Sequence, residues 1–256
     1  MRIVVLGGTG HVGRKVVDKL ERRAQAVVVA SPASGVDART GRGLDAALEY
    51  ADVLIDVTNS PDLSGPAARS FFEEATSHLL AAEERAGVKH HLVLSIVGAD
   101  HAGEEGYFAA KGVQEQAVVS GPIPYSILRS TQFYDFARRI AEWNTTEDTV
   151  HLPPRPVQPV AASDVADALV ELAMGRPLAG SVDVGGPEQM LLPDFVNRVL
   201  RVDNDPRYVV EDDDATLVGF NVSGDHLLPS SPSLSAVTTL DSWVHEEGLR
   251  RLVGTR

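Results

Sequence analysis

Cysteine is absent from this chain of 256 residues. This absence excludes disulfide bonds and metal sites built on thiolates, and it is compatible with a reducing compartment. Long apolar runs are absent too: the run at residues 3–6 ends in glycines, and no later stretch approaches the roughly 20 apolar residues of a membrane span. We therefore expect a soluble, cytoplasmic protein with no membrane partner.

Positive charge is scarce as well. The chain carries 23 Lys and Arg residues against 36 Asp and Glu residues, which leaves a formal net charge of -13, and no basic stripe reverses the sign locally. A surface of this charge repels phosphate backbones, so no nucleic-acid partner is expected. The eight histidines include the pair His90 and His91. None is spaced with carboxylates as metal ligands are, so no metal is expected.

Apolar residues make up 43% of the chain, enough to bury the core of one large α/β domain. In the first half, β-branched runs alternate with segments of helical periodicity such as 66–86. This alternation is typical of a parallel sheet covered by helices on both faces. The pattern therefore predicts a doubly wound α/β fold. Its strands are expected at residues 2–6, 26–30, 52–57, 91–95, 125–129 and 181–184.

The pattern loosens after residue 130, where prolines at 153, 154, 156 and 159 mark an irregular stretch. The acidic run 211–214 and the segment 229–233 are typical of surface loops. Three aromatic residues at 133, 134 and 136 follow a predicted strand and fit a substrate-pocket wall or the core equally well. Further helices are predicted to begin at Ser163 and Asp164, at Pro193 and near Leu240.

The segment GGTGHVG, residues 7–13, follows the first predicted strand and leads into a helical pattern of valines and leucine. Its glycines satisfy the spacings Gly8-x-Gly10-x-x-Gly13 and Gly7-x-x-Gly10-x-x-Gly13 together. Such glycines form a tight turn, let the backbone approach a pyrophosphate and allow close packing of helix and sheet. The helix N-terminus supplies N–H donors. A strand before the glycines and a helix after them favour a dinucleotide site over a merely tight turn.

The choice between NAD and NADP depends on the end of the second predicted strand. An acidic residue there usually binds the 2′-hydroxyl of the adenine ribose in NAD-binding proteins. Here residues 30–35 read ASPASG, and no acid occurs before Asp37. Small residues leave room for a 2′-phosphate, and Arg14, Arg39 or Arg42 can neutralise it. The sequence therefore favours NADP(H) over NAD(H).

A second group of residues indicates carbonyl chemistry. Ser95 ends a predicted strand, and Tyr107-x-x-x-Lys111 follows on a predicted helix. Residues four apart share one helix face, so the ammonium of Lys111 can stand near the phenol of Tyr107 and lower its pKa while also reaching a ribose hydroxyl. Ser95 would lie at the sheet edge where open α/β folds bind ligands. We therefore predict Ser95, Tyr107 and Lys111 as catalytic residues.

Over most of its length the chain resembles the atypical short-chain dehydrogenases/reductases of the NmrA-like, NAD(P)H-binding group. The resemblance implies a Rossmann-type core, about residues 1–150 plus 160–190, and a small C-terminal substrate lobe from about 130–160 and 190–256, within one domain 1–256. The segments that carry it are GGTGHVG (7–13), DVTNSP (56–61), LSIVGAD (94–100), GYFAAKGVQE (106–115), LRSTQFYDF (128–136), VQPVAASDVADAL (157–169) and VGGPE (184–188).

The same resemblance implies where the cofactor lies. The glycine loop would surround the pyrophosphate, residues 56–59 would line the adenosine side, and residues 130–133 would line the nicotinamide side. Ser95, Tyr107 and Lys111 would match the catalytic serine, tyrosine and lysine of the family. The predicted cofactor-binding residues are Gly7, Thr9, Gly10, His11, Val12, Gly13, Ser31, Val57, Thr58, Asn59, Ser95, Lys111, Thr131 and Phe133.

These features predict an NAD(P)H-dependent oxidoreductase that reduces a small carbonyl or quinone-like substrate, with tyrosine as proton donor. Two alternatives stay open. One is a non-catalytic regulatory protein that senses the redox state of NAD(P), and the other is a non-redox enzyme that keeps its cofactor tightly bound. The oligomeric state is also open, with a homodimer as one option.

Overall fold

The computed structural model describes residues 1–103, 105–217, 223–230 and 233–254. Within these ranges, seven strands form one sheet in the order β12-β9-β5-β4-β3-β1-β2, and every neighbouring pair is parallel. The order reverses between β1 and β3, as it does in doubly wound dinucleotide-binding folds. The strands are β1 (Arg2–Leu6), β2 (Ala26–Ala30), β3 (Val53–Asp56), β4 (His90–Ile96), β5 (Tyr125–Ser130), β9 (Gly180–Gly185) and β12 (Ser233–Ser235).

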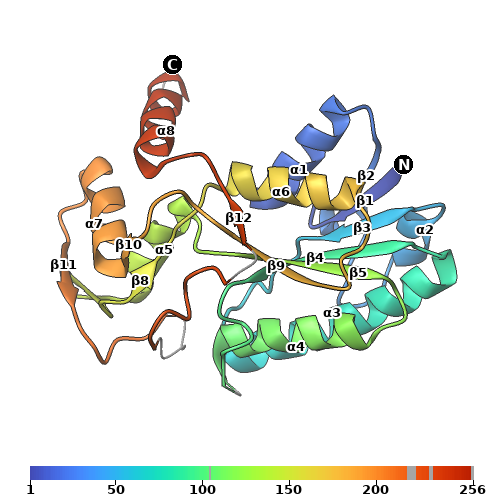
Figure 1. Ribbon diagram of the computed structural model, residues 1–256, viewed down its shortest axis with the longest axis horizontal. Coiled ribbons are helices and arrows are strands. Elements are labelled where there is room, and N and C mark those ends of the chain that lie inside the picture. The colour runs from blue at the N-terminus through green and yellow to red at the C-terminus, as the bar shows by residue number, and fades with distance from the viewer. Residues whose placement is uncertain (104, 218–222, 231–232, 255–256) are drawn as a thin grey trace.

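Helices cover both faces of this sheet (Figure 1). One face carries α1 (His11–Arg22) and α6 (Ala162–Met174). The other carries α2 (Leu44–Leu48), α3 (Gly65–Ala86) and α4 (Gly106–Ser120). This three-layer arrangement confirms the predicted Rossmann-type fold class.

The apolar periodicity of the sequence explains why these helices pack on the sheet. On α1, Val12, Val16 and Leu20 recur at helical spacing, and all three are buried against the strands. Helix α3 ends at Gly87, whose φ of 70° lies in the left-handed region that glycine adopts without strain. The segments that lead from each strand into the next helix lie at the carboxyl ends of the strands, where the ligand site of such folds lies.

The later part of the chain forms a lobe with its own core, in which Ile140, Leu152, Phe195 and Leu227 are buried together. Figure 1 shows this lobe beside the carboxyl ends of the main strands. Its helices are α5 (Ala137–Trp143), α7 (Leu192–Val202) and α8 (Leu240–Gly254). Its strands are β6 (Thr145–Thr146), β7 (Thr149–Leu152), β8 (Pro156–Val157), β10 (Met190–Leu191) and β11 (Tyr208–Glu211), in sheets β11-β7-β6 and β10-β8.

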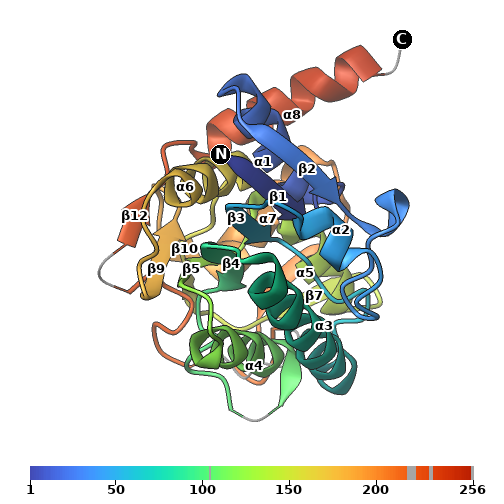
Figure 2. The same ribbon diagram turned by 90° about the vertical axis from the view of Figure 1, so that its right-hand side faces the viewer.

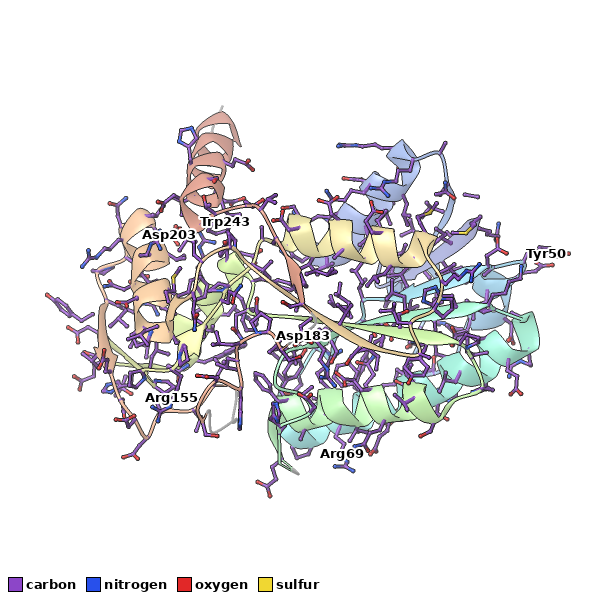
Figure 3. The ribbon with its side chains drawn as sticks, viewed as in Figure 1. Tyr50, Arg69, Arg155, Asp183, Asp203 and Trp243 are labelled. Carbon is purple, nitrogen blue, oxygen red and sulfur yellow. The ribbon has the colours of Figure 1, made fainter. Side chains whose placement is uncertain are left out.

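Helix α8 joins the lobe through Trp243 near its first turn. The Trp243 ring packs on Tyr134 and lies 5.4 Å from the guanidinium of Arg138, which also forms a 2.6 Å ion pair with Asp203 at the end of α7. Figure 3 shows Asp203 and Trp243 close to each other between α7 and α8. The rest of α8 projects away from the sheet (Figure 2).

All six predicted strands are present, with ends that differ by at most one residue. The loop prediction for 211–214 is wrong at its start because Glu211 ends β11, and that for 229–233 is wrong at its end because Ser233 begins β12; residues 231–232 lie outside the described residues. Both strands are so short that no alternation of side chains marks them. Within the described ranges, no helix combines the length and the apolar character that crossing a membrane requires.

Candidate functional site

A pocket of about 760 Å³ opens at the carboxyl ends of β1, β3, β4 and β5. Its wall includes Leu6 at the end of β1 and Val57, Ser95 and Ser130 at or just beyond the ends of the next three strands. Every residue predicted as catalytic or named as cofactor-binding lines this pocket except Gly13, whereas Asp56, expected on the adenosine side, does not. The topology thus brings together the glycine loop and the Ser95, Tyr107 and Lys111 set, about one hundred residues apart in the sequence.

The glycine loop forms a tight backbone turn. Gly7 has a φ of 81°, and a Cβ built there would lie 2.9 Å from the carbonyl oxygen of Val57. Gly10 is the N-cap residue that precedes α1, and no described side chain caps the first turn of that helix. The N–H groups of such a turn and the positive end of the helix dipole are suited to a phosphate.

Gly13 is the one residue of the predicted catalytic and cofactor-binding set that does not line the pocket. It is buried, and a Cβ at this position would lie 2.2 Å from the carbonyl oxygen of Gly7 and 2.7 Å from the Cα of Gly8. Its missing side chain therefore allows α1 to pack on the turn itself, the close packing that the spacing predicts for one of these glycines.

The pocket wall also includes Ser31, Asp37 and Arg39, which follow β2 in the chain. The guanidinium of Arg39 forms a 2.8 Å ion pair with Glu74, and the carboxylate of Asp37 accepts hydrogen bonds from the backbone N–H groups of Arg39 and Thr40. Arg14 donates to the carbonyl oxygen of Thr9, and neither Arg14 nor Arg42 lines the pocket. Of the three arginines predicted to face a 2′-phosphate, Arg39 alone is a pocket residue.

Ser95 lies near the end of β4 and is 3% exposed. Its Oγ has no hydrogen-bond partner among the described residues. A buried hydroxyl without a partner is costly unless something completes its hydrogen bonds, so this atom is ready to bind a polar group of a ligand.

Tyr107 and Lys111 lie in the first two turns of α4 and line the same pocket. The Tyr107 hydroxyl donates a 2.9 Å hydrogen bond to Oδ1 of Asn59. Burial raises the pKa of Tyr107 well above its ordinary value, and the bond to Asn59 offsets this rise only in part. The net shift of the Tyr107 pKa is therefore opposite to the lowering expected from Lys111, because desolvation of the phenol dominates.

The ammonium of Lys111 has partners of its own. It donates a 2.8 Å hydrogen bond to the carbonyl oxygen of Leu94 and another to Oε1 of Gln114, and it lies 4.6 Å from the centre of the Phe72 ring. Burial lowers the pKa of Lys111 to about 8, against the opposing effect of Asp56 and Glu115. A lysine with a pKa near neutrality in a pocket is typical of a functional site.

The structure assigns different places to Phe133, Tyr134 and Phe136, which from the sequence fit a pocket wall or the core equally well. Phe133 and Phe136 line the pocket. In contrast, Tyr134 is 1% exposed in the lobe core, and its hydroxyl donates a 2.8 Å hydrogen bond to the carbonyl oxygen of Thr238. Sequence reasoning missed further wall residues from strands, from the segments before and after them, from α3 and α4, and from the lobe. Helical periodicity could have indicated Phe71 and Phe108, but no local pattern marks the others. The missed apolar residues are Leu6, Pro32, Val36, Ala38, Pro61, Leu63, Phe71, Leu94, Ile96, Phe108 and Leu217.

Comparison with known proteins agrees with this geometry. A family model described as NAD(P)H-binding matches residues 7–175, which include both the glycine loop and the Ser95, Tyr107 and Lys111 set. The chain belongs to the NAD(P)H-binding family. The NAD(P)H-binding part of the resemblance is thereby confirmed. A search of curated proteins finds no match to the sequence.

Several solved structures share the fold. A short-chain dehydrogenase/reductase superfamily protein from Agrobacterium tumefaciens with bound NAD has a TM-score of 0.72 at 17% identity, and the match covers 100% of this chain and 98% of that one. UDP-N-acetylglucosamine 4-epimerase from Bacillus cereus gives 0.71 at 15% identity, over 97% and 96% of the two chains. UDP-glucose 4-epimerase from Thermus thermophilus, in complex with NAD, gives 0.66 at 18% identity, over 96% and 93%.

Proposed function

We propose that this protein is an NAD(P)H-dependent reductase that acts on a small, apolar carbonyl or quinone-like compound. The observation that carries the proposal is the meeting of two residue sets in one pocket. The glycine loop supplies backbone donors for a dinucleotide, and Ser95, Tyr107 and Lys111 supply a proton donor, a cation and a free hydroxyl. Either set alone would support only binding.

The residues present fit a dinucleotide. A side chain at Gly7 would collide with the backbone of Val57, so the tight turn in the pocket wall requires glycine there, and the first turn of α1 offers its N–H groups. Lys111 would bind a ribose hydroxyl, and Thr131 and Phe133 would lie on the nicotinamide side. When bound, the reduced nicotinamide supplies a hydride for a carbonyl carbon.

The chain's own residues would handle the carbonyl oxygen. The unpartnered Oγ of Ser95 would donate a hydrogen bond to it. The high pKa of Tyr107 keeps its phenol protonated at neutral pH, and Asn59 holds the hydroxyl in the pocket. Transfer of this proton to the oxygen, with the hydride added at carbon, gives the alcohol, and the ammonium of Lys111 would stabilise the tyrosinate left behind.

The pocket wall favours an apolar substrate. Leu63, Phe71, Phe108, Phe136 and Leu217 contribute apolar surface beside the proton donor. An apolar wall binds hydrocarbon surface and leaves sugar hydroxyls without hydrogen-bond partners. We further propose a preference for NADP(H), because Arg39 lies in the same pocket as the small residue Ser31, and a cytoplasmic location, where the reduced cofactor is available.

Tyr107→Phe tests the proposal. The purified protein is assayed for oxidation of NADPH with a panel of apolar aldehydes and quinones. For an accepted substrate, Tyr107→Phe should lower kcat by about 10²–10⁴-fold, the usual contribution of a general acid, without weakening cofactor binding. The matched control is Tyr50→Phe, since Tyr50 is 79% exposed and lies at the end of the molecule remote from the lobe (Figure 3). Unchanged turnover in Tyr107→Phe would contradict the assignment.

A second candidate is an isomerase that keeps its cofactor. The shared fold with two 4-epimerases favours it. Such an enzyme would co-purify with oxidised cofactor that does not exchange with added NAD(P)H. A protein that only senses cofactor would bind both redox states and oxidise NADPH with no member of the panel.

A further inference from the structure

Two buried polar residues behind Lys111 connect it to the sheet. We propose that Gln114 and Asp56 are positioning residues, which hold the ammonium of Lys111 in one place at the pocket wall so that it can serve the cofactor ribose and Tyr107. This inference rests on the proposed function, because it assigns a purpose to Lys111. Neither Gln114 nor Asp56 lines the pocket, whereas Lys111 does.

The three side chains form a continuous chain of hydrogen bonds. The Lys111 ammonium donates to Oε1 of Gln114, and Nε2 of Gln114 donates to Oδ2 of Asp56 over 3.0 Å. All three residues are at most 3% exposed. Asp56 is itself fixed, because its Oδ1 accepts bonds of 2.9 Å and 2.7 Å from the backbone N–H and the hydroxyl of Thr58. This series of hydrogen bonds therefore anchors Lys111 of α4 to the end of β3.

The hydrogen-bond count explains what this arrangement achieves. An ammonium group has three N–H donors. Gln114 and the carbonyl oxygen of Leu94 each take one, and these two directions define the place of the third. A flexible lysine side chain loses substantial rotamer entropy when it binds a ligand, and a side chain that the protein already holds loses less.

The charges around Lys111 are unevenly compensated. Asp56 on β3 and Glu115 on α4 both raise the pKa of Lys111 against its burial. Glu115 is already in a 2.6 Å ion pair with Arg129. Further along the same face of the sheet, His91 on β4 is paired with Glu83 on α3. Asp56 is therefore the main counter-charge, and Gln114 lies between it and the ammonium.

The sequence makes this inference directly measurable, because it contains four lysines, Lys15, Lys19, Lys89 and Lys111. In protein labelled with ¹³C at lysine Cε, NMR titration follows each lysine separately, and Lys111→Arg identifies the signal of Lys111. In the wild type this signal should titrate with a pKa of about 8. Asp56→Asn should lower the proton affinity of Lys111 about tenfold, because the counter-charge is lost while the burial stays.

Two variants of Gln114 separate positioning from packing. Gln114→Glu brings a carboxylate into contact with the ammonium, so the pKa of Lys111 should rise above the wild-type value. Gln114→Leu should weaken NADPH binding about tenfold, the usual effect of losing a hydrogen bond to a charged group. The matched control is Gln116→Leu, on the exposed face of the same helix, which should change neither quantity. The double variant Asp56→Asn with Gln114→Glu should restore the pKa and the affinity.

The proposal is overturned if Asp56→Asn and Gln114→Glu leave the pKa of Lys111 where it is in the wild type, or if Gln114→Leu binds NADPH as the control does. Thermal unfolding of each variant shows whether it is folded. If a single variant does not fold, the double variant Asp56→Asn with Gln114→Glu still tests the proposal. The NMR titration needs no turnover. Its failure is therefore distinguishable from failure of the proposed function, which an unaffected Tyr107→Phe would show.

Discussion

Two buried basic side chains lie on the same side of the sheet, between the strands and helices α3 and α4, and they differ in what surrounds them. His91 and Glu83 form a 2.8 Å pair in which both side chains are 0% exposed, and neither lines the pocket. Lys111 is almost as buried, yet it reaches the pocket and contacts its counter-charge Asp56 only through Gln114.

Their pKa values move in opposite directions. Glu83 raises the pKa of His91 despite burial, whereas burial lowers the pKa of Lys111. A buried ion pair with no access to the pocket, such as His91 with Glu83, is a structural component, and removing one partner should lower the stability of the fold. An incompletely compensated charge beside a cavity is available for chemistry. Burial alone thus does not distinguish a charged core residue from a site residue. The position of the counter-charge and the access of the side chain to a cavity do.

Breaking the buried pair of His91 and Glu83 should have the largest effect on the free energy of unfolding. Glu83→Ala leaves His91 buried without its partner, and such losses cost about 3–5 kcal/mol of unfolding free energy. Urea unfolding measures this cost, and Glu84→Ala, at the exposed neighbouring position, is the control. Cofactor affinity of the folded variant should stay at the wild-type value.

The pH dependence of that cost gives a second check. Because the pKa of His91 is raised in the folded protein, the pair contributes its full stability below the unfolded pKa of about 6.5 and loses it as pH rises through the folded pKa. The difference between wild type and Glu83→Ala should therefore shrink toward alkaline pH. A difference that grows instead would contradict the charged pair.

Substitution at the glycine turn should change cofactor binding as well as the free energy of unfolding. Gly13→Ala places a Cβ against the backbone of Gly7, so α1 must shift on the glycine turn. We expect a loss of about 1–3 kcal/mol, as for overpacked cores, together with weaker binding of both NADPH and NADH. Gly180→Ala is the control, because a Cβ there meets its nearest atom at 3.9 Å. Equal effects of the two substitutions on cofactor binding would show that Gly13 has no special role.

The smallest expected effect concerns the choice of cofactor. Arg39→Ala should weaken NADPH binding about tenfold, through loss of a charge-assisted hydrogen bond to the 2′-phosphate, and leave NADH binding unchanged. Arg85→Ala removes a comparable exposed arginine outside the pocket and serves as the control. If Arg39→Ala weakens both cofactors alike, the arginine does not discriminate between them.

Local sequence patterns predicted the parts of the site that depend on neighbours in the chain. The glycine spacing, the strands and the i, i+4 relation of Tyr107 and Lys111 all follow from short-range periodicity. The partners of these residues do not. Tyr107 bonds to Asn59, 48 positions away, and Gln114 bonds to Asp56, 58 positions away. The direction of the Tyr107 pKa was mispredicted for the same reason, since burial is a tertiary property.

The lobe was harder to anticipate. Strands such as β8 and β10 are two residues long, too short for an alternating pattern, and Leu217 reaches the pocket from a segment without periodicity. The residues that would select the substrate are therefore the ones that local patterns describe least.

We propose that one pocket of this protein both binds NAD(P)H and places a proton donor beside it. Parallel titrations with NADPH and NADH, followed by nicotinamide fluorescence in wild type and Tyr107→Phe, with a subsequent addition of an accepted carbonyl compound, test it most directly. We predict saturable binding of one cofactor per chain in both proteins, tighter for NADPH, and rapid oxidation of the bound cofactor in the wild type alone. Absence of saturable binding, or equal oxidation in the two proteins, would contradict the claim.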